Sequence, residues 1–351
     1  MTSTYFLGAN TPEGFRSEYG TLQADQRIRR LLIIKGGSGC GKSTLMKALA
    51  DRAEEYGWET ERILCSSDPD SLDGLVIPEL GLALVDGTAP HVVEPRLCGC
   101  GANYLNLGRY YREELLQPLA PAIRAAKAAN AACYGPAYGC LRAAANLTRS
   151  RKQLLSRDRI RAVTQEALSQ LMPEQPPQGK QRGSCRRIYL DGLTPKGPMT
   201  LSPGPGRLWA IGDSYGTAAG LLRALADAWQ EAGCQVVLVM DPLDPDAVAG
   251  VLLPEKSLGW LRTNQIFPGP RQALLRLDLD GALEEGLSPL QMDRMAVLRE
   301  LEARLVREAT GWLTQAKAHH DMLEELCRPA VDFAGVQRET ELLCRDLFTE
   351  S

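Results

Sequence analysis

Along the first part of the chain, short apolar runs alternate with a stretch in which apolar residues recur at helical spacing. Each run is short and bounded by polar or glycine residues, which predicts a buried strand. The runs are 5–9, 31–34, 60–64 and 82–86. After the second run, Leu45, Met46 and Leu49 predict a helix that ends at Gly57. Strands alternating with helices predict an α/β fold with a mostly parallel sheet and helices on both faces.

The second half of the chain repeats the first. Residues 36–79 align with 212–255 without a gap and are identical at many positions, which predicts two copies of one α/β unit. The copies differ at Gly41-Lys42-Ser43-Thr44, which aligns with Thr217-Ala218-Ala219-Gly220, and at Asp86, which aligns with Arg262. The second copy therefore lacks the cation and the hydroxyl of the first.

A helical segment follows each copy. The first covers about 105–172 and is predicted to break near Gly135-Pro136 into a helical hairpin. The second covers about 288–348 and is predicted to break near Pro329 and Gly335. Pro, Gly and polar residues predict a linker between the copies. The expected organisation is a first domain at 1–172, the linker at 173–185 and a degenerate repeat at 186–351.

The loop after the run at 31–34 has the form G-x-x-x-x-G-K-S and begins at Gly36. A strand before such a loop and a helix after it are the context in which it binds phosphate. Its glycines allow main-chain N–H groups to point at one anion, and the helix start adds partial positive charge. Lys42 is expected to contact β- and γ-phosphate oxygens, Ser43 to bind Mg²⁺, and Thr44 to support the loop. The other expected contacts are Gly37, Ser38, Gly39, Cys40 and Gly41.

A nucleotide-binding loop of this kind also needs a carboxylate that holds Mg²⁺. Asp86 ends an apolar run and is the first candidate for metal binding and catalysis; the alternative is a turn residue. Asp68 is the second catalytic candidate. Because Pro69 follows it, the alternative is the cap of a short helix that begins there. Asp70 and Asp73 are expected on a solvated face of that helix.

Two further groups are candidates for phosphate contacts. His91 closely follows the predicted strand at 82–86 and offers a phosphate contact or a base, although packing is the more common role of a single histidine. Six basic residues near the end of the first helical segment offer an arginine finger or a nucleic-acid contact. Asp158 and Glu166 interrupt them, so we favour a solvated basic face. The six are Arg149, Arg151, Lys152, Arg157, Arg159 and Arg161.

Composition narrows the class of protein. The chain has 351 residues, 44% hydrophobic and 24% charged, which are values of a globular protein with room for two domains. A net charge of −3 gives no electrostatic case for a nucleic-acid or membrane partner. No apolar run could cross a bilayer and no signal peptide is visible, so we expect a cytoplasmic protein. Only Cys98 and Cys100 form a close pair among ten cysteines, which predicts reduced thiols.

Four stretches of the first copy form a distinctive set: 6–15, the loop at 36–44, 65–74 and 86–91. Together they resemble a family of bacterial tandem P-loop proteins, which are described as ATPases or as similar to nucleotide kinases. The resemblance covers nearly the whole chain and implies ATP binding by the loop residues, without supplying a substrate. The chain departs from an intact pattern at Ala218 and Ala219, which argues against a second active site.

These observations predict a Mg²⁺-ATP-binding P-loop protein, a slow ATPase with one working site in the first repeat. ATP is preferred because no N-K-x-D-like string marks guanine selection. Two alternatives stay open. One is a small-molecule or nucleotide kinase whose helical segment holds the phosphoryl acceptor. The other is a non-enzymatic ATP sensor that acts through a protein partner.

Overall fold

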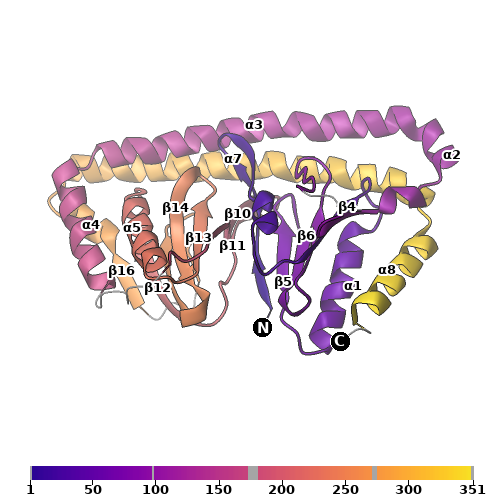
Figure 1. Ribbon diagram of the computed structural model, residues 1–351. Coiled ribbons are helices and arrows are strands. Elements are labelled where there is room, and N and C mark those ends of the chain that lie inside the picture. Colours follow the sequence, from indigo (N-terminus) through magenta and orange to yellow (C-terminus); the bar gives the residue numbers. More distant parts are fainter. Residues whose placement is uncertain (1, 97–98, 173–180, 271–274, 349–351) are drawn as a thin grey trace. The chain divides into compact units, whose positions relative to one another are not determined.

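The computed structural model describes residues 2–96, 99–172, 181–270 and 275–348 (Figure 1). The chain forms two compact units, each with one six-stranded sheet and helices, so the expected α/β class is confirmed. The first unit comprises Met1–Gly8, Ser17–Pro136 and Trp312–Ser351, and the second comprises Ala9–Arg16 and Ala137–Gly311. The predicted boundaries at 172 and 186 do not coincide with these units, because two long helices each contribute residues to both.

The sheet of the first unit has the strand order β1-β5-β6-β7-β4-β8. The central strand β6 is antiparallel to β5 and β7, whereas the other neighbouring pairs are parallel. The sheet is therefore mixed, and the prediction of a mostly parallel sheet is wrong at β6. The strands are β1 Ser3–Tyr5, β4 Arg30–Lys35, β5 Glu61–Cys65, β6 Asp68–Ile77, β7 Leu82–Asp86 and β8 Ala102–Asn106.

The short helix predicted to begin at Asp68 is also wrong, because this residue starts β6 and a tight turn joins it to β5. The last six residues of β6 are all buried. Apolar side chains packed on both faces and pairing with two neighbouring strands outweigh the local Asp-Pro signal for a helix. Asp73, expected on a solvated helix face, is consequently buried within the sheet.

Helix α1, Lys42–Glu55, follows β4 as predicted. Its residues Leu45, Met46 and Leu49 are buried in the core of the first unit, and Gly57 just beyond its end has φ +76°. Helix α8, Phe333–Phe348, also packs against α1 and contributes Val336 to the same core. Burial of this apolar face, more than intrinsic propensity, holds α1 beneath the loop that precedes it.

The second unit repeats the first strand by strand. Its sheet has the order β9-β13-β14-β15-β12-β16, and helix α5, Ala218–Glu231, takes the place of α1. The hairpins β5–β6 and β13–β14 carry an irregularity at the same aligned position. The predicted repeat is therefore present in the topology. The strands are β9 Cys185–Ile188, β12 Arg207–Gly212, β13 Val236–Asp241, β14 Asp244–Leu253, β15 Leu258–Thr263 and β16 Leu275–Asp278.

Two small hairpins stand apart from the main sheets. One consists of β2, Gly8–Thr11, and β3, Gly14–Ser17; the other consists of β10, Asp191–Thr194, and β11, Gly197–Thr200. Asn10 donates a hydrogen bond to the carbonyl oxygen of Leu193 at 2.9 Å, which joins the hairpins within the second unit.

Helices α3, Ala120–Gln153, and α7, Pro289–Cys327, contribute to both units. Helix α3 continues through Pro136, so the predicted break there is wrong. Contacts with α7 on either side of the proline, such as Asn130 to the carbonyl of Ala316, support the helix despite the lost N–H donor. The break near Pro329 is confirmed, since a 3₁₀ turn separates α7 from α8. The break near Gly335 is wrong, because this residue lies inside α8.

The remaining helices are short or lie at the ends of these elements. They are α2 Glu113–Leu116, α4 Arg157–Leu171, α6 Leu279–Glu284 and the 3₁₀ turns Tyr19–Gln23, Pro78–Leu80, Leu107–Tyr110, Gln117–Leu119, Pro254–Lys256 and Arg328–Ala330. Most of the predicted linker, 173–180, lies outside the described residues.

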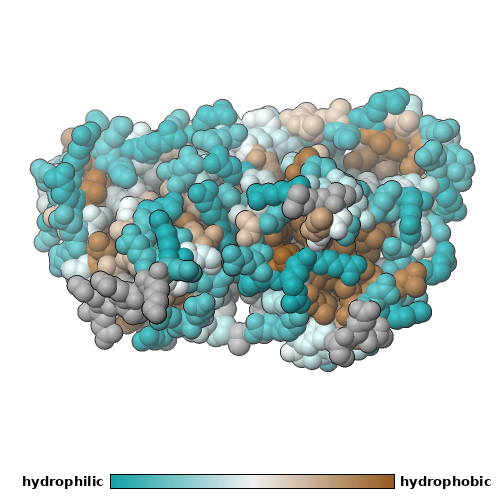
Figure 2. All heavy atoms as spheres, viewed as in Figure 1, coloured by the Kyte–Doolittle hydropathy of each residue, from teal (hydrophilic) through white to brown (hydrophobic). Residues whose placement is uncertain are grey.

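The face shown in Figure 2 is covered largely by hydrophilic side chains, and hydrophobic ones show through over the first sheet. Of the helices that the structure describes, none combines the length and the hydrophobicity needed to span a bilayer.

Candidate functional site

The loop at 36–44 joins β4 to α1 in the first unit. Gly39 and Gly41 have φ +74° and +95°, a backbone conformation that glycine adopts without strain. Gly41 is the N-cap of α1, and no side chain caps this helix start. Among the hydrogen bonds of the described residues, none is donated by the main-chain N–H of Gly37, Ser38, Gly39 or Gly41. These donors are therefore available to an anion.

Lys42 bends back over the loop. Its ammonium donates hydrogen bonds to the carbonyl oxygens of Gly36 at 3.0 Å and Gly37 at 2.9 Å. It also lies 3.6 Å from Oδ2 of Asp86, and its side chain is 13% exposed. The structure thus brings together the lysine of the loop and the carboxylate that ends the apolar run at 82–86.

Asp86 combines a turn contact with a position beside the loop. Its Oδ1 accepts hydrogen bonds from the main-chain N–H and the hydroxyl of Thr88, which is the turn role. Its Oδ2 faces Lys42, which is the position expected of a carboxylate beside a phosphate-binding loop. The turn fixes the carboxylate while leaving one oxygen directed at the loop.

The other predicted loop residues differ in exposure. The hydroxyl oxygen of Ser43 accepts a hydrogen bond from the main-chain N–H of Leu72 at 2.9 Å, so β6 fixes its position. Thr44 is exposed on α1. Cys40 is buried, and burial raises the pKa of its thiol, which suits a packing role.

Asp68 belongs to a neighbouring group rather than to the Lys42 pair. It accepts a hydrogen bond from the hydroxyl of Ser71 at 2.8 Å and lies 3.7 Å from the ammonium of Lys317 on α7. On the same helix, Nε2 of His320 lies 3.5 Å from the hydroxyl of Ser38. The sequence predicted no role for His320, because nothing local signals a contact between residues so far apart in the chain.

Tyr111 was also missed. Its hydroxyl donates a hydrogen bond to the carbonyl oxygen of Ser38 at 2.7 Å, and burial raises its pKa, so it remains a donor. A Cβ atom at Gly37 would lie 2.8 Å from this hydroxyl. Glycine at this position therefore lets the tyrosine pack against the loop.

In the second unit, the corresponding loop is filled by the protein's own carboxylates. Asp213, which aligns with Gly37, is fully buried and accepts hydrogen bonds from the main-chain N–H groups of Tyr215, Thr217 and Ala218 at 3.2, 3.0 and 2.8 Å. The N–H of Ser214 donates to Asp280 at 2.8 Å. The alignment of Gly37 with Asp213 was the sequence signal for this difference.

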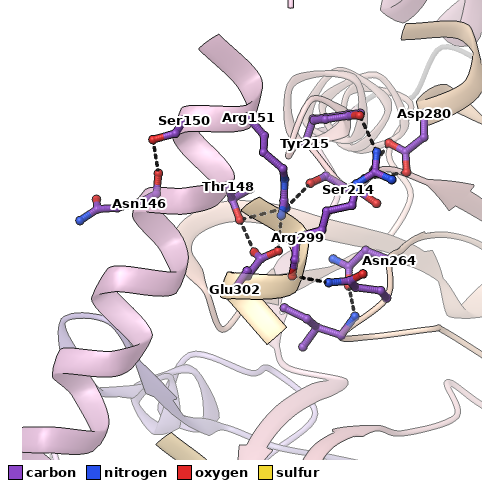
Figure 3. A network of polar contacts seen from close by, with 12 residues as sticks. Asn146, Thr148, Ser150, Arg151, Ser214, Tyr215, Asn264, Asp280, Arg299 and Glu302 are labelled. Atoms are coloured by element: carbon purple, nitrogen blue, oxygen red, sulfur yellow. Dashed lines mark hydrogen bonds and ion pairs between the residues drawn. The ribbon is translucent and has the colours of Figure 1, made fainter. Parts of the chain in front are cut away.

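Two basic residues near the end of α3, Arg151 and Lys152, contact the same second loop, and Figure 3 shows Arg151. Arg151 is 2% exposed; it pairs with Glu302 and donates to the carbonyl oxygen of Ser214 at 2.8 Å. Lys152 donates to the carbonyl of Gly216 at 2.9 Å. The predicted solvated face is therefore wrong for Arg151, because a buried acid and a loop carbonyl satisfy its charge. Arg149, Lys152, Arg157 and Arg161 are exposed, as expected.

Arg262 takes the place of Asp86 in the second unit and forms a buried ion pair with Asp241. Asp191 is also buried, and burial raises its pKa to about 7 despite a hydrogen bond from Thr200. A cavity of about 90 Å³ is lined in part by Tyr215, Asp241 and Arg262. Ligand pockets commonly measure about 300–1,000 Å³. This cavity is too small for a nucleotide.

His91 is a buried residue of the first unit. Its Nε2 lies 3.0 Å from Oδ2 of Asp73, and its ring centroid is 4.9 Å from that of Tyr19. Burial disfavours the charged ring, but the hydrogen bond and charge of Asp73 outweigh it and raise the pKa of His91. Packing, the more common role, describes its position better than a phosphate contact.

No family model, no curated protein and no solved structure matches the chain. The nine cysteines in the described ranges are free thiols, in line with the prediction; Cys98 lies outside those ranges.

Proposed function

We propose that the first unit binds ATP with Mg²⁺ at the loop 36–44 and hydrolyses it slowly, and that the second unit binds no nucleotide. One contrast supports this proposal. The main-chain N–H groups of Gly37, Ser38, Gly39 and Gly41 meet no protein acceptor among the described residues. Those of the second loop are satisfied by Asp213 and Asp280. The same backbone feature is left for an external anion in one copy and filled internally in the other.

Each residue of the first loop then has a role. The main-chain N–H groups and Lys42 hold the β- and γ-phosphates, and Lys42 exchanges its bonds to loop carbonyls for phosphate oxygens. The hydroxyl of Ser43 and the Oδ2 of Asp86 are the hard oxygen donors that suit Mg²⁺. The ion supplies charge that stabilises the transferring phosphoryl group. Asp86 rather than Asp68 orients the attacking water, because Asp86 lies beside Lys42.

Isothermal titration of the full chain with Mg²⁺-ATP and Mg²⁺-GTP tests the proposal. We expect one site per chain and a preference for ATP. Lys42→Ala should weaken ATP binding by roughly 10–100-fold, the loss of one charge-assisted contact, and abolish hydrolysis. Arg52→Ala removes an exposed cation from the same helix and should change neither. Two sites per chain, or equal losses in both variants, would contradict the proposal.

One observation favours phosphoryl transfer to a second substrate as an alternative. Lys317 and His320 of α7 lie beside Asp68 and Ser38, where polar side chains could hold an acceptor next to the loop. An acceptor-dependent rise in ADP production during a metabolite screen would support the kinase. Stoichiometric ATP binding without turnover over hours would instead support a sensor.

A further inference from the structure

A second cluster of chemically active residues lies in the first unit. It shares no residue with the loop, although His91 is close enough to Lys42 and Asp86 to interact with their charges. It consists of Cys65 at the end of β5, Asp73 within β6 and His91 after β7. One ligand atom from each lies within 4.8 Å of the others, and the His91–Asp73 pair is separated by 3.0 Å. Asp73 and His91 are 6% and 7% exposed. Their separation along the chain hides them from any search for metal-binding spacing.

The donor set suits a borderline-soft divalent ion. Thiolate, imidazole and carboxylate are the three ligand types that Zn²⁺ uses in proteins. Bonds of about 2.0–2.3 Å in a tetrahedral site place ligand atoms roughly 3.3–3.8 Å apart. The separations in the cluster, from 3.0 Å to at most 4.8 Å, bracket that range. Small side-chain shifts are sufficient to seat an ion.

An outer residue already orients the cluster. The hydroxyl of Tyr19, itself fully buried, donates a hydrogen bond to Oδ2 of Asp73 at 3.2 Å, and its ring packs against His91. Metal-binding carboxylates and histidines are commonly fixed by such partners.

The two repeats also differ at this cluster. Continuing the alignment of the copies, Cys65, Asp73 and His91 correspond to Asp241, Ala249 and Phe267. Asp241 pairs with Arg262, and Phe267 is buried. The donor set is thus present in the copy that keeps the intact loop and is replaced in the other.

We propose that Cys65, Asp73 and His91 bind one Zn²⁺-class transition-metal ion, with a fourth coordination position left for water or a substrate atom. Binding releases the thiol proton of Cys65 as the metal–sulfur bond forms. This site is separate from the Mg²⁺ that accompanies a nucleotide, and it does not depend on the proposed ATPase activity.

Titration of the metal-stripped full chain with Co²⁺ under reducing conditions tests the site. We expect one equivalent to bind with a thiolate-to-cobalt charge-transfer band, which added Zn²⁺ removes. Cys65→Ser should abolish the band, whereas Cys140→Ser, a control at another partly buried cysteine, should keep it. Tyr19→Phe leaves the three ligands in place and should weaken binding by about 10–100-fold.

Several results would overturn the inference. One is the absence of a charge-transfer band at saturating Co²⁺, and another is a band that persists in Cys65→Ser. A third is loss of the bound equivalent in His320→Ala, which would assign the ion to the cluster of His320, Asp321 and Glu324 on α7. If circular dichroism shows that Cys65→Ser does not fold, the Tyr19→Phe variant decides instead. An unchanged affinity of this variant for Co²⁺ would also overturn the inference.

Discussion

The loops at 36–44 and 212–220 are the same turn between a strand and a helix, but their main-chain N–H groups are satisfied in different ways. In the first unit, where position 37 is glycine, the main-chain N–H groups of 37–39 and 41 have no acceptor in the part of the chain that the structure describes, and Lys42 lies over the loop. In the second unit, Asp213 stands at the aligned position and its carboxylate takes the place of an anion. The comparison teaches that a single buried carboxylate of the chain can satisfy the N–H groups of such a turn, since buried N–H groups need an acceptor.

The largest expected effect comes from removing that substitute. Asp213→Ala should destabilise the second unit by about 3–5 kcal/mol, because several buried N–H groups lose their acceptor together. Urea unfolding measures the loss. Asp227→Ala, which removes a partly exposed acid from α5, should cost under about 0.5 kcal/mol. Where the Asp213 variant is still folded, ATP hydrolysis should be unchanged, and a loss equal to that of Lys42→Ala would contradict the comparison.

The reverse substitution places an aspartate in the first loop, and its carboxylate should fill that loop as Asp213 fills the second. Gly37→Asp places a carboxylate among the free donors and should weaken ATP binding by more than about 100-fold, as competition by a tethered anion requires. Titration calorimetry measures the affinity. Gly37→Ala introduces the same Cβ contact with Tyr111 without the charge. An equal loss in the alanine variant would show that crowding, not the carboxylate, blocks the loop.

A smaller effect is expected from pH. The pKa of Asp191 is about 7 in the folded chain, above its unfolded value, so its contribution to stability is full below about pH 4 and is lost as pH rises to about 7. Asp191→Asn should remove this slope, which is at most about 1.4 kcal/mol per pH unit. Unfolding curves for both chains across this range give the difference. Parallel pH profiles would show that Asp191 titrates normally.

The smallest effect is expected at position 43 of the first loop and at the aligned position 219 of the second. Ser43→Ala is expected to weaken Mg²⁺-dependent ATP binding by about tenfold, because it removes one uncharged oxygen ligand of the ion, which water can replace. Ala219→Ser restores a hydroxyl at the aligned position of the second loop and should create no site, because Asp213 still fills it. A second ATP-binding event in this variant would contradict the statement that Asp213 keeps nucleotide out of the second loop.

Local patterns predicted the elements on which the candidate site depends. The apolar run before Gly36 and the helical spacing after Lys42 predicted β4 and α1, and the run ending at Asp86 predicted β7. Their pairing in one sheet follows from that alternation, so Lys42 and Asp86 meet as the candidate residues should. These predictions succeeded because each depended on neighbours in the chain.

The failures depended on partners far away in the chain. Strand β6 replaced a helix because β5 and β7 pair with it on either side. Arg151 is buried because Glu302, far along the chain, supplies its counter-charge. Helix α3 passes Pro136 because α7 supports it on both sides. A single sequence does not reveal which distant residue compensates a locally unfavourable one.

The interleaving of the two units has a consequence for biosynthesis. Val336 and Phe348 of α8 complete the core around α1, yet they are synthesised long after it. The nascent chain cannot finish its first unit before α8 has been made, although the loop at 36–44 is made early. Polypeptides divided between 172 and 186 would each carry fragments of both units, so the halves should become soluble only when produced together.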